Sequence, residues 1–241
     1  NKNIGNGGSS VKKRCAVLMQ ACINTSMLAV CRSLNGFPKE RAVVRREMAR
    51  GHGSYGIGAY FFSKLLVETP VDTVFPVVFG LVLSKMSGLN KKGLGPLLKT
   101  LALQTCAAST LGLSIGALSP TSEMALAIGP CVMVLSIMLG DETGAFAEIP
   151  DSLTGLSHLS LIKWGFRGCL SSEFEGLKFD PLADARRKTK MKEPCPPTGE
   201  HVLESMGLPI TGGANLAAKA QTKLVVANAL LTYLVLRVRG A

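Results

Sequence analysis

Three charged residues with helical spacing lie inside an otherwise apolar stretch. Lys64, Glu68 and Asp72 are four residues apart, so they share one face of a helix. Charges at membrane depth are costly and are functional candidates by default, which makes these residues a candidate intramembrane site. The spacing equally favours a structural network, because Lys64 can pair with Glu68 and extend toward the membrane surface. The sequence allows both interpretations.

A second candidate set lies in the first apolar segment. Gln20, Asn24 and Met27 follow the i, i+4, i+7 spacing and also share a helical face. Amide side chains at this depth are stabilised either by hydrogen bonds to a neighbouring helix or by a wet cavity. The set is therefore an interhelical contact or part of a substrate-binding surface.

Residues for enzymatic catalysis do not assemble in the sequence. His52, His158 and His201 lie in loop or rim segments, without a matching nucleophile. There is no glycine-rich ATP-binding motif ending in Gly-Lys-Ser/Thr, and the seven cysteines lack zinc-site spacing. We therefore predict a chain that is not an enzyme and holds neither a metal nor a cofactor of its own.

Long apolar segments must position these residues, and they predict an all-α polytopic membrane domain. Residues 101–139 hold one charged residue, Glu123, and Ser119-Pro120 divides them into two arms. A membrane span needs about 20 apolar residues. The alternative, a buried helical hairpin in a soluble protein, normally has shorter helices. We predict a loop-like N-terminus at 1–14, a membrane domain at 15–241 and a long outer loop at 140–222. The five predicted spans are 15–35, 57–86, 97–118, 122–139 and 223–238.

The chain is strongly basic, with a net charge of +11. Such a balance often indicates nucleic-acid binding. Here the basic residues lie between apolar segments, where anionic headgroups and membrane topology account for them. We predict membrane lipid rather than nucleic acid as a partner, and an integral multi-pass protein of the plasma membrane or an organelle membrane.

Residues 37–70 carry the most specific pattern in the chain. Their first half is rich in arginine, four glycines follow at 51, 53, 56 and 58, and Tyr60-Phe61-Phe62 opens an apolar run. The pattern F-P-x-E-R-x-V-x-x-R-E…G-x-Y…Y-F-x-x-K-x-x-x-E-x-P resembles the ABC-2 type membrane domain of the White/ABCG subfamily of ABC transporters. Residues 172–177 resemble the N-E-F-x-G-L motif of this family, and residues 195–203 resemble its C-x-x-T-G-x-x-x-L motif.

The resemblance implies roles for individual segments. Gln20, Asn24 and Met27 would line a substrate cavity that Leu139 closes. Residues 38–50 would form a coupling helix against an ATPase domain, although a solvated, salt-bridged face explains the same charges. The charged residues of this segment are Glu40, Arg41, Arg45, Arg46 and Glu47.

The outer loop has expected features of its own. Residues 149–164 resemble the short re-entrant helices of the family, and a short helix is expected from His201 to Met206. Cys195 matches a family cysteine that commonly forms a disulfide. Its partner would be Cys169, a cysteine of another subunit, or none.

The resemblance implies a function that this chain performs only with partners. The family has six spans after an ATPase domain, so the chain resembles a fragment without that domain and the first span. It would be the membrane half of an ATP-driven exporter of lipids, sterols or amphipathic small molecules, working as a homo- or heterodimer. ATP and Mg²⁺ would be held by a separate nucleotide-binding domain. The alternatives are an ATP-independent permease or channel and a non-transporting fragment of a broken gene.

Overall fold

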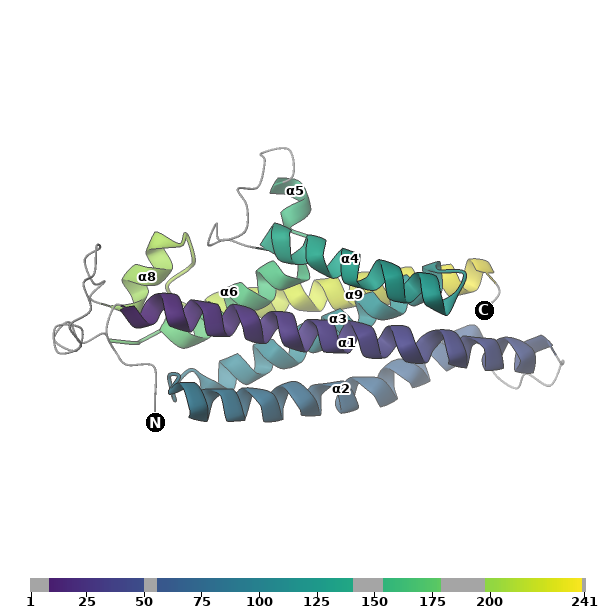
Figure 1. Cartoon of the computed structure of the whole chain (residues 1–241), viewed down its shortest axis with the longest axis horizontal. Coiled ribbons are helices and arrows are strands. Elements are labelled where there is room, and N and C mark those ends of the chain that lie inside the picture. Colours follow the sequence, from purple (N-terminus) through teal and green to yellow (C-terminus); the bar gives the residue numbers. More distant parts are fainter. Residues whose placement is uncertain (1–8, 50–55, 141–153, 179–197, 240–241) are drawn as a thin grey trace.

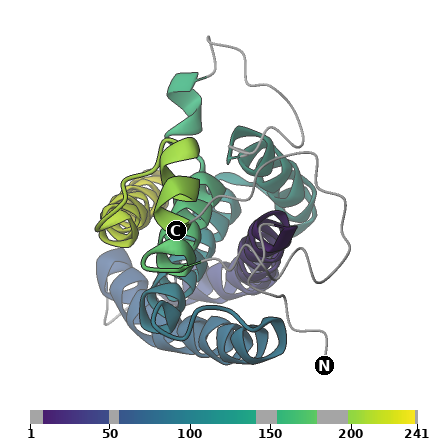
Figure 2. The same ribbon diagram turned by 90° about the vertical axis from the view of Figure 1, so that its left-hand side faces the viewer.

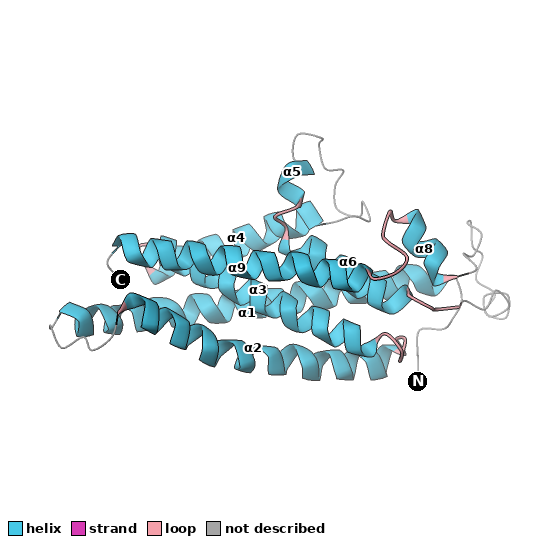
Figure 3. Ribbon diagram, turned by 180° about the vertical axis from the view of Figure 1, so that it is seen from behind, coloured by secondary structure: helices cyan, strands magenta, loops and turns pink. Residues whose placement is uncertain are grey.

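The regular elements of the structure are helices, as the sequence predicts (Figure 1). The computed structural model describes residues 9–49, 56–140, 154–178 and 198–239, and within them the all-α fold is confirmed (Figure 3). The helices are α1 (Ser9–Ala49), α2 (Ile57–Ser87), α3 (Leu94–Leu118), α4 (Ser122–Gly140), α5 (Thr154–Ser157), α6 (Leu161–Phe174), α8 (Gly199–Ser205) and α9 (Gly213–Arg239).

Four helices are long and apolar enough to cross a membrane. The candidate spans are Val11–Gly36 within α1, followed by α2, α3 and α4. α9, with 27 residues, runs beside α3 along the bundle (Figure 3). α9, which contains the predicted span 223–238, is not among the four candidate spans. Its length of about 40 Å, at 1.5 Å per residue, would cover about 30 Å of hydrocarbon.

The long helices are packed around α3. It contacts α1 and α9 most extensively, and also α2, α4 and α6. α6 lies in the bundle against α1, α3, α4 and α9, as the view along the helices shows (Figure 2). α2 and α4 lie toward opposite sides of this core (Figure 2). The arrangement leaves much of α2 and α4 facing outward.

Local sequence signals account for several helix ends. α2 ends at Gly88, whose φ of +66° is left-handed and whose N–H donates to the Ser84 carbonyl. The Ser160 hydroxyl accepts the Lys163 N–H at the start of α6, and Thr198 caps α8 by accepting from His201. Ser160 also donates to the Ser136 carbonyl at 2.6 Å, which fixes the start of α6 against α4.

The first helix differs from the sequence-based prediction at both of its ends. Residues 9–14, predicted as loop, are helical, and the predicted span 15–35 continues without a break into the segment 38–49. Residues 36–49 include two Glu, three Arg and two Ala, which are strong helix formers. In a long helix, a proline such as Pro38 more often causes a bend than an end. The proposed coupling segment is therefore a direct extension of the first span.

The outer loop is shorter than predicted. Within 140–222, α6 is a buried helix, and α9 begins at Gly213, ten residues before the predicted start of the last span at 223. The alanine-rich start of α9 packs on α3 and α6, which favours a helix over a loop. The sequence-based prediction placed the residues of α6 in the outer loop, whereas the structure buries most of this helix in the bundle.

Candidate functional site

Lys64 joins the extended end of α1 to α2. Its ammonium group forms ion pairs with Glu40 on α1 and, at 2.6 Å, with Glu68 on its own helix. The Tyr60 hydroxyl also donates to Glu40, at 3.4 Å. The Lys64 side chain is 5% exposed and that of Glu40 is 48% exposed, so the cluster lies at the edge of the packed region. This contact ties α2 to the C-terminal part of α1.

Asp72 has different partners and links three helices. It forms an ion pair with Arg32 of α1 and accepts a 2.7 Å hydrogen bond from Ser109 of α3. Ser109 is in turn 3.0 Å from the hydroxyl of Ser33 on α1. The structure thus brings Lys64 and Glu68 together, but it places Asp72 in a separate network. The reason is that residues of neighbouring helices pair with Lys64 and with Asp72 separately.

A buried ion pair that the sequence did not suggest closes the other end of the bundle. Arg14 of α1 pairs with Glu173 of α6, and both side chains are 1% exposed. The Asn90 N–H donates to Glu173 at 2.9 Å, and the Asn90 amide donates to the Glu173 carbonyl at 3.2 Å. Burial raises the pKa of Glu173, while the Asn90 N–H and the Arg14 guanidinium act to lower it. Glu173 belongs to the 172–177 motif, which is the only sequence signal that could have singled it out.

A second unpredicted network lies at the centre of the bundle. The Gln104 amide donates to Ser26 at 2.9 Å, and Gln221 donates to Gln104 at 2.8 Å. Both glutamines are fully buried. Gly165 of α6 faces this site so closely that a Cβ there would overlap the Gln104 amide. The network therefore joins α1, α3 and α9 where α6 crosses them.

The predicted cavity residues lie on the outward face of α1 and near the end of α4. Gln20 and Asn24 are exposed and joined by a 2.7 Å hydrogen bond, whereas Met27 and Leu139 are half-buried. α4 crosses α1 where Gly129 meets Leu34. The two helices run in opposite directions (Figure 1). Leu139 is ten residues beyond Gly129, about 15 Å along the helix, and so lies roughly level with residues 20–24.

The sequence comparisons identify the family of this chain. The family model described as ABC-2 type transporter matches residues 2–174, well over half of the 241 residues. The chain belongs to the ABC-2 type transporter family. It is therefore an ABC transporter membrane component and an integral multi-pass membrane protein, as its apolar helices also indicate.

Similar curated proteins confirm the resemblance to the White/ABCG subfamily. The chain is 35% identical over 237 residues to ABC transporter G family member 7 of Arabidopsis thaliana, which covers 97% of this chain and 31% of that protein. It is 28% identical over 220 residues to Protein white of Drosophila melanogaster, and the match covers 90% of this chain and 31% of that protein. It is 28% identical over 169 residues to ATP-binding cassette sub-family G member 3 of Mus musculus, and the match covers 66% of this chain and 25% of that protein. The chain spans about a third or less of the length of these relatives.

Two sets of predicted residues of this ABC-2 domain are only partly visible. In the segment 38–49, Arg46 is exposed, while the side chains of Arg41, Arg45 and Glu47 lie outside the described residues. Cys169 is a free, buried cysteine whose sulfur is 3.6 Å from that of Cys22, and Cys195 lies outside the described residues. The coupling role and the Cys195 disulfide stay predictions.

Proposed function

We propose that this ABC-2 domain is the membrane half of an ATP-driven exporter of the ABCG type. The observation that carries the proposal is the continuity of α1, whose 41 residues (Ser9–Ala49) include both the buried Arg14 and the basic segment 38–49. Such a helix is about 60 Å long. A push on its C-terminal part would reach the Gln20–Asn24 face as a rigid-body movement.

The ion pairs suggest how that movement would be shared. Lys64 couples Glu40 to α2, so α2 would follow the end of α1. Asp72 holds α1 and α2 to α3 through Arg32 and Ser109, so the three helices would tilt together. In the proposal, a nucleotide-binding domain with ATP and Mg²⁺ supplies the push, because neither the 38–49 segment nor the networks contain residues for ATP hydrolysis.

The same geometry supports a dimeric cavity for amphipathic cargo. The outward faces of α1 and α4 carry exposed apolar residues such as Leu28, Val134 and Leu135 beside the Gln20–Asn24 pair. A second half-transporter would cover these faces. A few amides in apolar surroundings suit a molecule with one polar group, such as a sterol or lipid.

Charge reversal in the α1 extension tests the proposal. Arg45→Glu with Arg46→Glu should reduce ATP-dependent transport to background, because the helix would repel the surface that drives it. Membrane insertion should be unchanged, since the substituted residues lie beyond the candidate span Val11–Gly36. Transport into vesicles and ATP hydrolysis are measured together, with the partner ATPase present.

The matched control is Lys91→Glu with Lys92→Glu, which makes the same charge change at exposed residues between α2 and α3. It should transport normally. Full transport by the Arg45/Arg46 variant would refute the coupling role. Transport that continues without any ATPase partner would show an ATP-independent permease instead.

A further inference from the structure

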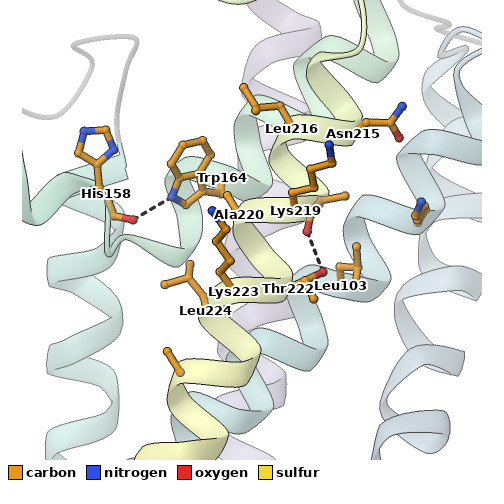
Figure 4. A pocket seen from close by; sticks show the side chains of 13 residues that line it. Leu103, His158, Trp164, Asn215, Leu216, Lys219, Ala220, Thr222, Lys223 and Leu224 are labelled. Atoms are coloured by element: carbon orange, nitrogen blue, oxygen red, sulfur yellow. Dashed lines mark hydrogen bonds between the residues drawn. The ribbon is translucent and has the colours of Figure 1, made fainter.

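A groove of about 940 Å³ lies on the α9 side of the bundle, between α3, α6 and α9 (Figure 4). α9 is not among the main contacts of α1 or α4, so the groove is separate from the proposed cargo face. It is lined by Lys99, Leu103, His158, Trp164, Leu216, Lys219, Lys223 and Leu224, together with small and polar residues of α9.

Three lysines give the groove a concentrated positive charge. Lys99 lies in the second turn of α3, and Lys219 and Lys223 are one turn apart on α9. The side chains of Lys219 and Lys223 extend in the same direction, toward the end of α9 that holds Leu216 (Figure 4). Among the described residues, no acidic side chain lines the groove and no ion pair includes these lysines.

The rest of the lining is amphipathic. Trp164 donates its indole N–H to the His158 carbonyl at 2.8 Å, and the Arg167 guanidinium lies 5.4 Å from its ring centroid. Tryptophan and lysine with this geometry are typical of the headgroup level of a bilayer. Leu224 and Ala227 continue the lining along α9 as an apolar surface. The groove thus has a cationic end and an apolar end.

The depth of Lys219 agrees with this placement. A 27-residue α9 is about 40 Å long, so when centred across a 30 Å hydrocarbon layer it would extend about 5 Å beyond each side. Lys219 is six residues from the start of α9, about 9 Å along the helix. Its side chain extends back toward that start and can bring the ammonium group to the lipid phosphates.

We propose that this groove binds one anionic glycerophospholipid. Lys99, Lys219 and Lys223 hold its phosphate and charged headgroup, and an acyl chain follows Leu224 and Ala227 along α9. Charge complementarity selects an anionic over a zwitterionic lipid. The site depends on the chain being in a membrane and not on its coupling to ATP hydrolysis, so it goes beyond the proposed transport function.

Trp164 makes the proposal directly measurable, because it is the single tryptophan of the 241-residue chain. Brominated acyl chains quench a tryptophan that they contact. The detergent-solubilised chain is titrated with brominated phosphatidylglycerol and, separately, with brominated phosphatidylcholine. We expect phosphatidylglycerol to quench at concentrations about 100-fold lower, since each of the three lysines contributes roughly a fivefold preference for an anionic lipid.

Lysine variants test whether the preference for phosphatidylglycerol arises in the groove. Lys219→Gln with Lys223→Gln should reduce the preference to about fivefold, because Lys99 remains, whereas Lys219→Arg with Lys223→Arg should retain the full preference. Lys91→Gln with Lys92→Gln removes the same charge outside the groove and should retain it too. Thermal unfolding in the same detergent verifies that each variant is folded.

Three results would overturn the proposal. Equal quenching by both lipids would show that charge does not select the ligand. An unchanged preference in the Lys219/Lys223 glutamine variant would place the lipid elsewhere. Displacement of the brominated lipid by an equal concentration of inorganic phosphate would show a phosphate site that does not need acyl chains.

Discussion

α2 and α3 are both apolar membrane helices, yet they occupy opposite kinds of environment. In their most apolar windows, 78% of α3 is buried inside the protein, against 17% of α2. α2 is the more apolar of the two. Lipid is as apolar as a helix interface, so hydrophobicity does not select the buried helix in a membrane. Small and hydroxyl-bearing residues do, because they allow close approach and interhelical hydrogen bonds.

The contacts of the two helices follow this rule. α3 bonds its neighbours through Gln104, Ser109 and Ser114, the last of which lies 2.8 Å from the Thr232 hydroxyl of α9. α2 turns Leu66, Val67 and other large side chains outward. It is attached through Lys64, Asp72 and a few packed residues. The core is thus held by buried polar contacts, and α2 by a small number of attachment points.

The largest expected effect is on the buried polar contacts of the core. Arg14→Ala leaves the Glu173 carboxylate without its cation in a site that is 1% exposed. Removal of one partner of a buried ion pair costs about 3–5 kcal/mol. We expect a large fall in the melting temperature of the detergent-solubilised chain. Lys13→Ala, at the exposed neighbouring position, is the control and should melt like the unmodified chain.

The same variant has a predicted pH dependence. Burial raises the pKa of Glu173, so this carboxyl binds a proton more strongly in the folded chain than in the unfolded chain. A raised carboxyl pKa gives stability at low pH that is lost as pH rises through that pKa. Without Arg14 the pKa should rise further, so the deficit of Arg14→Ala should shrink on acidification. A deficit that is independent of pH would indicate lost packing rather than an unpaired charge.

The next effect concerns close approach at the α1–α3 crossing. A Cβ at Gly112 would lie 2.8 Å from the Ser33 Cβ and 3.1 Å from the Val30 carbonyl oxygen, which is backbone and cannot rotate away. Gly112→Ala should therefore destabilise the chain by about 1–3 kcal/mol, as overpacking does. Gly95→Ala is the matched control on the same helix, because nothing lies within 4 Å of its Cβ position. If both variants melt alike, the α1–α3 interface does not depend on close contact.

The sequence predicts the helices of this molecule better than their environments. The apolar segments predicted the bounds of α2, α3 and α4 to within a few residues, because the length of an apolar segment can be read from the local sequence. Lys64 and Glu68 could be paired from their spacing, since they lie on one helix. Arg14 could not be paired with Glu173, which is 159 positions away in the sequence and has no local signal for its partner.

Asp72 is another residue whose partners the sequence did not predict, although the helix that carries it was predicted correctly. Its spacing from Lys64 and Glu68 placed it on their face, but Arg32 and Ser109 come from other helices and determine its actual network. α6 is a comparable case, because the sequence-based prediction placed it in the outer loop, whereas Glu173 joins it to Arg14 inside the bundle. A helix pattern defines a face, whereas the partner of that face depends on the packing of the whole bundle.

The smallest expected effect is on the outward face of α2. Leu66 is 78% exposed, so Leu66→Ala should change the melting temperature by an amount equivalent to at most about 0.5 kcal/mol. The Leu66 side chain faces lipid both before and after α2 packs on the bundle. Its removal therefore changes the free energies of the two states by nearly the same amount. Leu113→Ala on α3, where the side chain is 1% exposed, should cost about 2–5 kcal/mol because it leaves a cavity. Equal costs at the two positions would mean that another protein surface covers α2, and the contrast between lipid-facing and core helices would then not hold.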